Sequence, residues 1–201
     1  MFNVTMQNHS PFNAPGVSDD IKLQYDLNIP EAQQYMNLMK HTDDALKKIV
    51  QYFEKQDEPT IVVFFGDHQP KLEDEFYDAV KEGYKLDEVY KNLNKRNTQF
   101  AIWANYDIEE QSDVYISANY MSSLVLDTAG LAKSGYEEFV SNVRKEVPII
   151  TKYGYIGKDG NFYKNTDKKS PYYDLILKYN ILEYNNIFDV KNRVESFFET
   201  K

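Results

Sequence analysis

The clearest pattern of apolar and polar positions is a predicted strand over residues 60–65, whose last five positions are all apolar. A strand with one face in water alternates apolar and polar residues. An unbroken run is instead typical of a strand covered on both faces, as in the middle of a parallel sheet. Gly66, Asp67 and His68 follow this run directly. Because ligand sites in open α/β sheets lie beyond the carboxyl ends of the strands, the pattern predicts that Asp67 and His68 reach the functional site.

A second, shorter strand is predicted over residues 2–6, and His9 lies in the polar turn that follows it. Between the two strands, residues 30–53 begin with a proline and carry apolar residues at spacings of three and four, which predicts a long helix with one face packed on the sheet. Strand, helix and strand form a crossover unit with parallel strands. Such a unit would bring His9 to the same sheet edge as Asp67 and His68.

The rest of the chain has patterns for further helices and strands. Helices are predicted over residues 73–82, 87–94, 119–129, 136–147 and 171–182, a strand over 98–104, and a hairpin over 152–164. No internal repeat, low-complexity tract or linker divides the sequence. We therefore expect one domain of the α/β class, in which helices flank a mostly parallel central sheet, with an α+β portion containing the hairpin toward the C-terminus.

Composition narrows the range of partners. The chain has 201 residues and a net charge of -9, which argues against a nucleic-acid partner and against electrostatic binding to anionic lipid. It has no cysteine, so disulfides and thiolate metal sites are excluded. No run reaches the roughly 18 apolar residues needed to span a membrane, and no signal peptide opens the chain, so we expect these 201 residues to be soluble.

The Gly66-Asp67-His68 tripeptide is the strongest candidate for chemistry. A carboxylate and an imidazole suit Zn²⁺, Mn²⁺ or Fe, and a glycine before them would let the backbone turn tightly. The alternative is a simple strand-end turn, in which Asp67 caps the loop and His68 is hydrogen-bonded. His9 is either a structural histidine or part of the same pocket. Two ligands fall short of the usual three or four, and the sequence contains no catalytic triad, Walker loop or dinucleotide-binding motif.

Several segments together resemble a known family. Residues 5–12 contain an Asn-His-x-Pro-Phe motif, and residues 62–70 contain the Gly-Asp-His motif after an apolar strand. The pair resembles the C-terminal part of sulfatase-like, lipoteichoic acid synthase-type phosphoglycerol transferases of the alkaline phosphatase superfamily. Further similar segments are 42–43, 100–106 and 184–188. The resemblance spans most of the chain and implies a partial alkaline phosphatase/sulfatase-like fold.

The resemblance also implies roles for individual residues. Asp67 and His68 match the motif that ligates a divalent metal, often manganese, with magnesium or zinc as alternatives. His9 matches a histidine that contacts the phosphoglycerol group. The family's threonine nucleophile, a glutamate ligand and a substrate-binding arginine precede the first matching motif. Residues 1–201 are thus expected to be the C-terminal portion of a single catalytic domain whose N-terminal half is absent, and to be inactive alone.

The implied reaction is phosphoglycerol transfer. A metal-activated threonine would attack a phosphodiester, form a covalent phosphoglycerol-enzyme and pass the group to a second hydroxyl. The substrate would be a glycerophospholipid or another phosphate or sulfate ester. The parent protein would be anchored in the membrane by upstream segments and act at the extracellular face. Two alternatives stay open at this point: a sulfatase or phosphodiesterase that uses water, and a non-catalytic binding domain that retains the fold.

Overall fold

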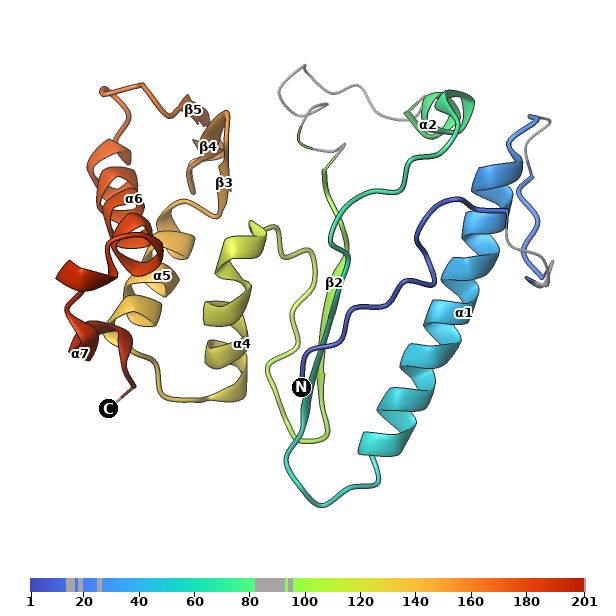
Figure 1. Cartoon of the computed structure of the whole chain (residues 1–201), viewed down its shortest axis with the longest axis horizontal. Helices are drawn as coiled ribbons and strands as arrows, with labels where there is room; N and C mark the ends of the chain where they lie inside the picture. The colour runs from blue at the N-terminus through green and yellow to red at the C-terminus, as the bar shows by residue number, and fades with distance from the viewer. Residues whose placement is uncertain (14–16, 18–19, 25–26, 82–92, 94–95, 201) are drawn as a thin grey trace. The chain divides into compact units, whose positions relative to one another are not determined.

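The computed structural model describes residues 1–13, 17, 20–24, 27–81, 93 and 96–200 (Figure 1). The chain forms two compact units, Met1–Tyr106 and Asp107–Lys201. Each has helices, strands and an apolar core of its own, which confirms the α/β class. The helix predicted over residues 87–94 lies outside the described residues, apart from Leu93. Within the described part of the chain, no helix has both the length and the apolar character needed to cross a membrane.

The first unit contains a two-stranded sheet. Strand β1 (Ile61–Phe65) pairs with β2 (Phe100–Ala104) in antiparallel fashion, with Val63 opposite Ile102. Among the described residues every strand pair in the chain is antiparallel, so the predicted parallel arrangement is not found there. An unbroken apolar run predicts that a strand is buried, but it carries no information on the direction of the neighbouring strand.

Residues 2–6, predicted as the first strand, form an irregular segment instead. The side chains of Phe2, Val4 and Met6 are exposed, although the ring of Phe2 lies 6.5 Å from that of Phe65 between centroids. The alternating segment has strand propensity, but within the described residues its backbone pairs with no strand. The predicted crossover unit is therefore not formed. The expectation that parallel strands bring His9 to the same sheet edge as Asp67 and His68 no longer has this support.

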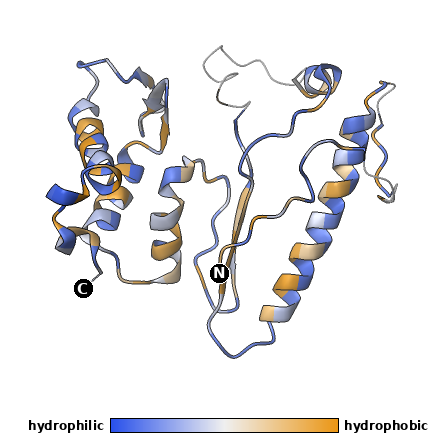
Figure 2. Ribbon diagram, viewed as in Figure 1, coloured by the Kyte–Doolittle hydropathy of each residue, from blue (hydrophilic) through white to orange (hydrophobic). Residues whose placement is uncertain are grey.

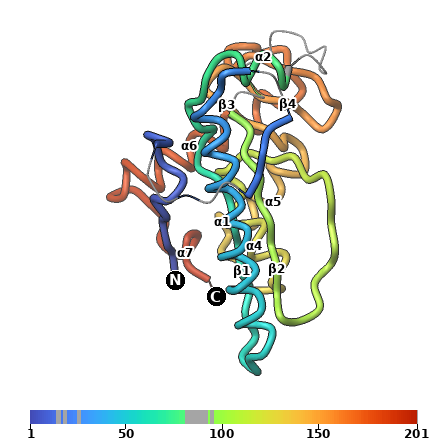
Figure 3. Tube along the Cα trace, turned by 90° about the vertical axis from the view of Figure 1, so that its right-hand side faces the viewer, coloured from blue at the N-terminus to red at the C-terminus, as the bar shows by residue number. Residues whose placement is uncertain are grey.

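Helix α1 (Pro30–Phe53) is long and straight (Figures 1 and 3). Its N-terminus is capped by Glu73, whose two carboxylate oxygens accept from the backbone N–H groups of Glu31 (2.7 Å) and Ala32 (3.0 Å). Such a cap satisfies donors that have no partner within the helix. Helix α2 (Asp74–Lys81) begins directly after this glutamate.

The predicted apolar stripe of α1 is buried only toward the N-terminal end of the helix. The core of the first unit consists of Phe12, Ile29, Ala32, Leu38 and Leu72. Further along the helix, Ile49 and Tyr52 are exposed, although apolar residues continue along its length (Figure 2). The buried face of α1 thus packs on the flanking loops and on Phe76 and Tyr77 of α2, and no described residue of β1 or β2 belongs to this cluster.

Asn105 joins the end of α1 to the start of the sheet. Its Nδ2 donates to the carbonyl oxygens of Phe53 (3.1 Å), Gln56 (3.0 Å) and Glu58 (3.0 Å). Its Oδ1 accepts from the backbone N–H of Thr60 (2.7 Å). One side chain therefore satisfies backbone groups along the whole connection between helix and strand, which would otherwise depend on water.

The second unit follows the predicted pattern closely. Its elements are the short 3-10 helix η1 (Ala118–Tyr120), α4 (Met121–Ala129), α5 (Gly135–Glu146), β3 (Ile149–Thr151), β4 (Gly154–Ile156), β5 (Phe162–Lys164), α6 (Tyr173–Ile187), the short 3-10 helix η2 (Val190–Asn192) and α7 (Glu195–Phe198). The predicted hairpin is formed by β4 and β5, and β3 adds a third antiparallel strand. Gly130 ends α4 with φ 65°, a left-handed conformation that favours glycine.

Tyrosines form much of the core of the second unit. Tyr120, Val140, Val143 and Tyr179 make one buried cluster. The hydroxyl of Tyr120 donates to the carbonyl oxygen of Val147 (2.8 Å), and burial raises the pKa of this tyrosine. The tyrosines thus serve packing here, and the buried ring of Tyr120 combines an apolar body with a hydroxyl that finds a partner.

Asp127, near the end of α4, ties this helix to α5. Its carboxylate accepts from Lys133 (2.6 Å), Ser141 (3.1 Å) and Arg144 (2.7 Å). Partial burial raises the pKa of Asp127, but the hydrogen bonds from Lys133 and Ser141 and the two cationic charges outweigh it, so the pKa lies below its ordinary 3.8. A depressed pKa in the folded state stabilises the protein above the unfolded pKa, and this stabilisation is lost as the pH falls.

We expect Asp127→Asn to lower the free energy of unfolding by about 1–2 kcal/mol at pH 7, because the amide loses the charge that holds both cations. The difference from the unchanged protein should shrink as the pH falls below 3.8 and the wild-type carboxylate is protonated. Urea denaturation followed by circular dichroism at pH 7 and at low pH measures it. Asp107→Asn, at an exposed position, is the control. If the loss of unfolding free energy in Asp127→Asn is the same at both pH values, the ionic explanation is contradicted.

Candidate functional site

The Gly66-Asp67-His68 tripeptide lies at the end of β1, as predicted. The backbone of Gly66 is tied to the segment before β2: its N–H donates to Gln99 O (3.1 Å), and the hydroxyl of Thr98 donates to Gly66 O (2.8 Å). A Cβ at position 66 would lie 3.1 Å from the Cβ of Thr98. A side chain at position 66 would therefore crowd Thr98, whereas the φ of Gly66 is not positive and does not by itself favour glycine.

Asp67 and His68 point into solvent, with 80% and 71% of their side chains exposed. The Oδ1 of Asp67 accepts from the backbone N–H of His68 (2.9 Å), so the carboxylate caps the turn. The Nδ1 of His68 lies 2.9 Å from Gln69 O. A carbonyl oxygen can only accept, so Nδ1 carries the hydrogen, and in the neutral ring the lone pair is on Nε2. Metal-binding histidines commonly have their second nitrogen held in this way.

The second polar atoms of the two side chains face each other, at the distance of an ion pair when the imidazole is protonated. The Nε2 of His68 and the Oδ2 of Asp67 are 3.5 Å apart. Two ligand atoms at ~2.1 Å from a common ion, with a tetrahedral angle between them, are ~3.4 Å apart. The two atoms are therefore spaced as two of the four ligands of a tetrahedral metal ion would be. Across the residues that the structure describes, no group of three or more His, Cys, Asp or Glu side chains is placed to hold a metal, so further ligands would have to come from elsewhere.

His9 is exposed and lies in a turn that is closed by its own backbone N–H, which donates to Met6 O (3.1 Å). Its Nδ1 lies 2.7 Å from Ser10 O and carries the hydrogen, as in His68. His9 does not join Asp67 and His68 in a metal-binding group of described residues. Its predicted contact with phosphoglycerol, and the metal role of the other two residues, stay predictions.

Sequence reasoning missed the side chains that hold the His9 turn in place. Gln7 Nε2 donates to Leu38 O (3.4 Å), and Asn8 Nδ2 donates to Thr42 Oγ1 (2.8 Å). Asn8 and Thr42 both lie in segments that carry the family resemblance, but nothing in the sequence pairs them. The one sequence feature that could have indicated this contact is Thr42 itself, a polar residue within the apolar stripe of the helix.

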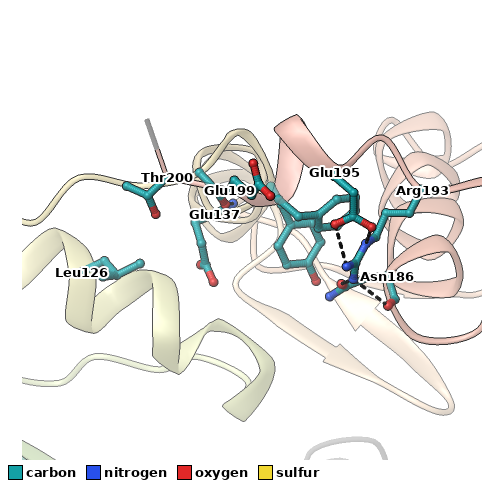
Figure 4. Close-up of a pocket in the computed structure, with 10 residues that line it drawn as sticks. Leu126, Glu137, Asn186, Arg193, Glu195, Glu199 and Thr200 are labelled. Carbon is teal, nitrogen blue, oxygen red and sulfur yellow. Dashed lines mark hydrogen bonds and ion pairs between the residues drawn. The ribbon is translucent and has the colours of Figure 1, made fainter. Parts of the chain in front are cut away.

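A pocket of about 580 Å³ lies within the second unit, between α5, the end of α6 and α7 (Figure 4). Among the described residues that line it, Arg193 is engaged: it donates through Nε (3.1 Å) and Nη2 (2.8 Å) to Glu195 and through Nη1 to Asn186 Oδ1 (3.2 Å). Glu137 and Glu199 add two more carboxylates to the lining. The excess of negative charge makes this pocket unsuitable for a phosphate or sulfate ester.

Comparisons with known proteins bear on both the fold and the site. The sulfatase family model matches residues 1–131. A putative cyclic beta-1,2-glucan modification protein of Rhizobium meliloti (strain 1021) is 26% identical over 212 residues, which cover 99% of this chain and 32% of that protein. The solved structure of Streptococcus pyogenes phosphoglycerol transferase GacH in complex with sn-glycerol-1-phosphate matches with a TM-score of 0.59 at 16% identity, over 85% of this chain and 39% of that chain.

The matches bear on the fold, on the extent of the chain and on the motif segments. The structural match confirms the expected partial alkaline phosphatase/sulfatase-like fold. The chain spans only about a third of the length of the relatives that it matches, 32% in one case and 39% in the other. The motif segments 5–12, 42–43, 62–70 and 100–106 all lie within the residues that the family model matches.

Proposed function

The chain belongs to the sulfatase family, and we propose that residues 1–201 are the C-terminal portion of a single metal-dependent catalytic domain that transfers phosphoglycerol. The observation that carries the proposal is the pairing of Asp67 Oδ2 and His68 Nε2, 3.5 Å apart at the end of a strand. The phosphoglycerol transferase whose fold this chain shares supports the choice of reaction.

Asp67 and His68 would hold the divalent metal, with manganese as the first choice and magnesium or zinc as alternatives, because a carboxylate oxygen and an imidazole nitrogen suit such ions. When bound, the ion would supply a positive charge that lowers the pKa of a nucleophilic hydroxyl and offsets charge developing on phosphorus. Gln69 O keeps the hydrogen of His68 on Nδ1, so that Nε2 is free for the metal.

His9 would contact the phosphoglycerol group of the substrate. Its ring is exposed and its Nδ1 is engaged by Ser10 O, so Nε2 is the atom available for a ligand. When neutral, Nε2 accepts a hydrogen bond from a glycerol hydroxyl, and when protonated it donates to a phosphate oxygen. The role is to position the substrate, and such contacts contribute to the rate by holding reacting groups in the correct geometry.

The remaining machinery would come from sequence outside this chain. In the family that the motifs resemble, the threonine nucleophile, a glutamate ligand and an arginine precede the Asn-His-x-Pro-Phe motif. We propose that the parent protein is anchored in the membrane by segments upstream of this chain and acts at the extracellular face on a glycerophospholipid. The Rhizobium meliloti relative is named for glucan modification, which supports a glucan hydroxyl as the acceptor.

The test is product analysis on the full-length protein with Mn²⁺, a glycerophospholipid and a β-1,2-linked glucan. We expect a mass increase of one phosphoglycerol on the glucan and release of diacylglycerol in equal amount, both dependent on the metal. Omission of the glucan is the control and should stop turnover after the covalent threonine intermediate. Release of diacylglycerol together with free glycerol phosphate, with no phosphoglycerol on the glucan, would favour the hydrolase, which the sulfatase family match supports. Absence of both products and of a covalent adduct would favour a binding domain.

A further inference from the structure

We infer that the Asn-His-x-Pro-Phe motif is a clamp, in which Asn8 and Phe12 bind α1 on either side of His9 and the hydroxyl of Thr42 is the anchor that positions this histidine. The inference deepens the proposed function, because it rests on the role of His9 as a contact for the substrate. It assigns to Thr42 and Asn8 a positioning role and no contact with the reacting atoms.

The clamp has one polar and one apolar attachment. Before His9, Asn8 Nδ2 donates to Thr42 Oγ1 (2.8 Å) and lies 3.4 Å from the sulfur of Met39. After His9, Phe12 is buried, and its ring lies edge-on to that of Tyr35 with 5.2 Å between centroids. Tyr35 and Thr42 are seven residues apart, two turns of helix, and so lie on one face of α1.

Thr42 is suited to this role because both functions of its hydroxyl are used. The oxygen accepts from Asn8, and the hydrogen is donated to Leu38 O (3.3 Å), the carbonyl one turn earlier in the helix. The second bond fixes the direction of the hydroxyl, so that a lone pair faces Asn8. A valine would have the same shape and neither function, whereas a serine would have both.

Asn8 is not explained by stability alone. Its Oδ1 is buried and finds no hydrogen-bond partner among the residues that the structure describes, and an unpaired buried amide oxygen is unfavourable. A residue that leaves a buried polar atom without a hydrogen bond is often retained because it serves a function. Here the Nδ2 group provides the contact with Thr42, and Gln7 adds a second bond to α1 through Leu38 O (3.4 Å).

The consequence is a histidine that is exposed yet held at both ends. The ring of His9 is free to meet a ligand, while the backbone before and after it is fixed to a rigid helix. Displacement of a positioned group by about 1 Å can cost about a hundredfold in rate. Loss of the Thr42 hydroxyl should therefore affect His9 without removing any group from the substrate contact.

The experiment compares Thr42→Val with Thr42→Ser in the 201-residue chain, with the nitrogen NMR shifts of the three histidines as the readout. At about pH 8.5, where imidazoles are neutral, the shifts report which nitrogen carries the hydrogen. We expect His9 to have it on Nδ1 in the unchanged chain and in Thr42→Ser. In Thr42→Val the ratio of the two tautomers should change at least tenfold toward Nε2–H, while His68 stays unchanged and serves as the internal control.

Asn8→Ala removes the same bond from the other side and should give the same change, which keeps the test decisive if Thr42→Val does not fold. An unchanged His9 tautomer in a folded Thr42→Val or Asn8→Ala chain would overturn the clamp, and so would a Thr42→Ser chain that behaves like Thr42→Val. These shifts do not depend on turnover. Failure of the role proposed for His9 would show separately, as a full-length His9→Gln protein that remains fully active, and failure of the proposed reaction as absence of phosphoglycerol transfer by the unchanged full-length protein.

Discussion

If the proposed transfer reaction is correct, Asp67→Asn in the full-length protein is expected to reduce kcat/KM about a thousandfold and to abolish activation by Mn²⁺. A metal ion that stabilises charge in the transition state contributes several kcal/mol, and about 1.4 kcal/mol is a factor of ten in rate. Asparagine is the informative replacement, because its amide oxygen can still accept from the backbone N–H of His68, the bond that caps the turn. The change thus removes the ligand charge and keeps the local fold.

The measurement is a Mn²⁺ titration of the transfer rate, together with the metal content of the purified protein. His68→Gln should give a similar loss, and the double variant should be little worse than either single one, because ligands of one ion act as a unit. Asp74→Asn, at an exposed carboxylate in the first turn of α2, is the matched control and should stay within about twofold. Full activity of Asp67→Asn would contradict the metal-binding role and would favour the alternative, that the tripeptide is only a strand-end turn.

Local patterns in the sequence were sufficient for most single elements. The helices over 136–147 and 119–129 and the hairpin over 152–164 were predicted because each depends on neighbours a few residues away. The helix predicted over 171–182 extends further, to Ile187, because the chain remains compatible with a helix beyond the apolar signal. Elements whose definition is local can be predicted without knowledge of what covers them.

Strand pairing could not be predicted in the same way. The apolar run of β1 implied burial on both faces, yet the strand is only partly buried and Phe65 is 41% exposed. Residues 2–6 have the composition of a strand and form none, because a strand needs a partner for its backbone and the identity of the partner is a long-range property. The same limit applies to α1, whose stripe gives a face but not the surface on which it packs.

In the candidate site, too, features set by adjacent residues were predicted and features set by distant residues were not. The placement of Asp67 and His68 at the end of a strand follows from residues that are adjacent in sequence, and it was predicted. The close approach of Thr98 to Gly66 was not predicted, because the two residues lie 32 positions apart in the sequence. The contact of Asn8 with Thr42 spans 34 residues and could not be read from either segment alone.

Asn105 is the position where we expect the largest loss of stability in the first unit. Asn105→Ala removes an acceptor for Thr60 N–H and the donor for three carbonyl oxygens. At about 0.5–1.5 kcal/mol for each hydrogen bond, and with part of the cluster open to water, the free energy of unfolding should fall by about 2 kcal/mol. That is a large part of the roughly 5–15 kcal/mol that stabilises a typical protein.

Asn105→Asp should cost more than Asn105→Ala, by about 1 kcal/mol or more, because it turns a carboxylate toward the carbonyl oxygens of Phe53, Gln56 and Glu58 and provides no donor. Chemical denaturation at pH 7 measures both variants, with Asn3→Ala, at an exposed asparagine, as the control. Near pH 3 the carboxyl group of the aspartate is protonated and again has a hydrogen to donate, so Asn105→Asp should recover toward Asn105→Ala relative to the unchanged chain. An aspartate that is tolerated at pH 7 would mean that water, and not Asn105, satisfies the connection between α1 and β1.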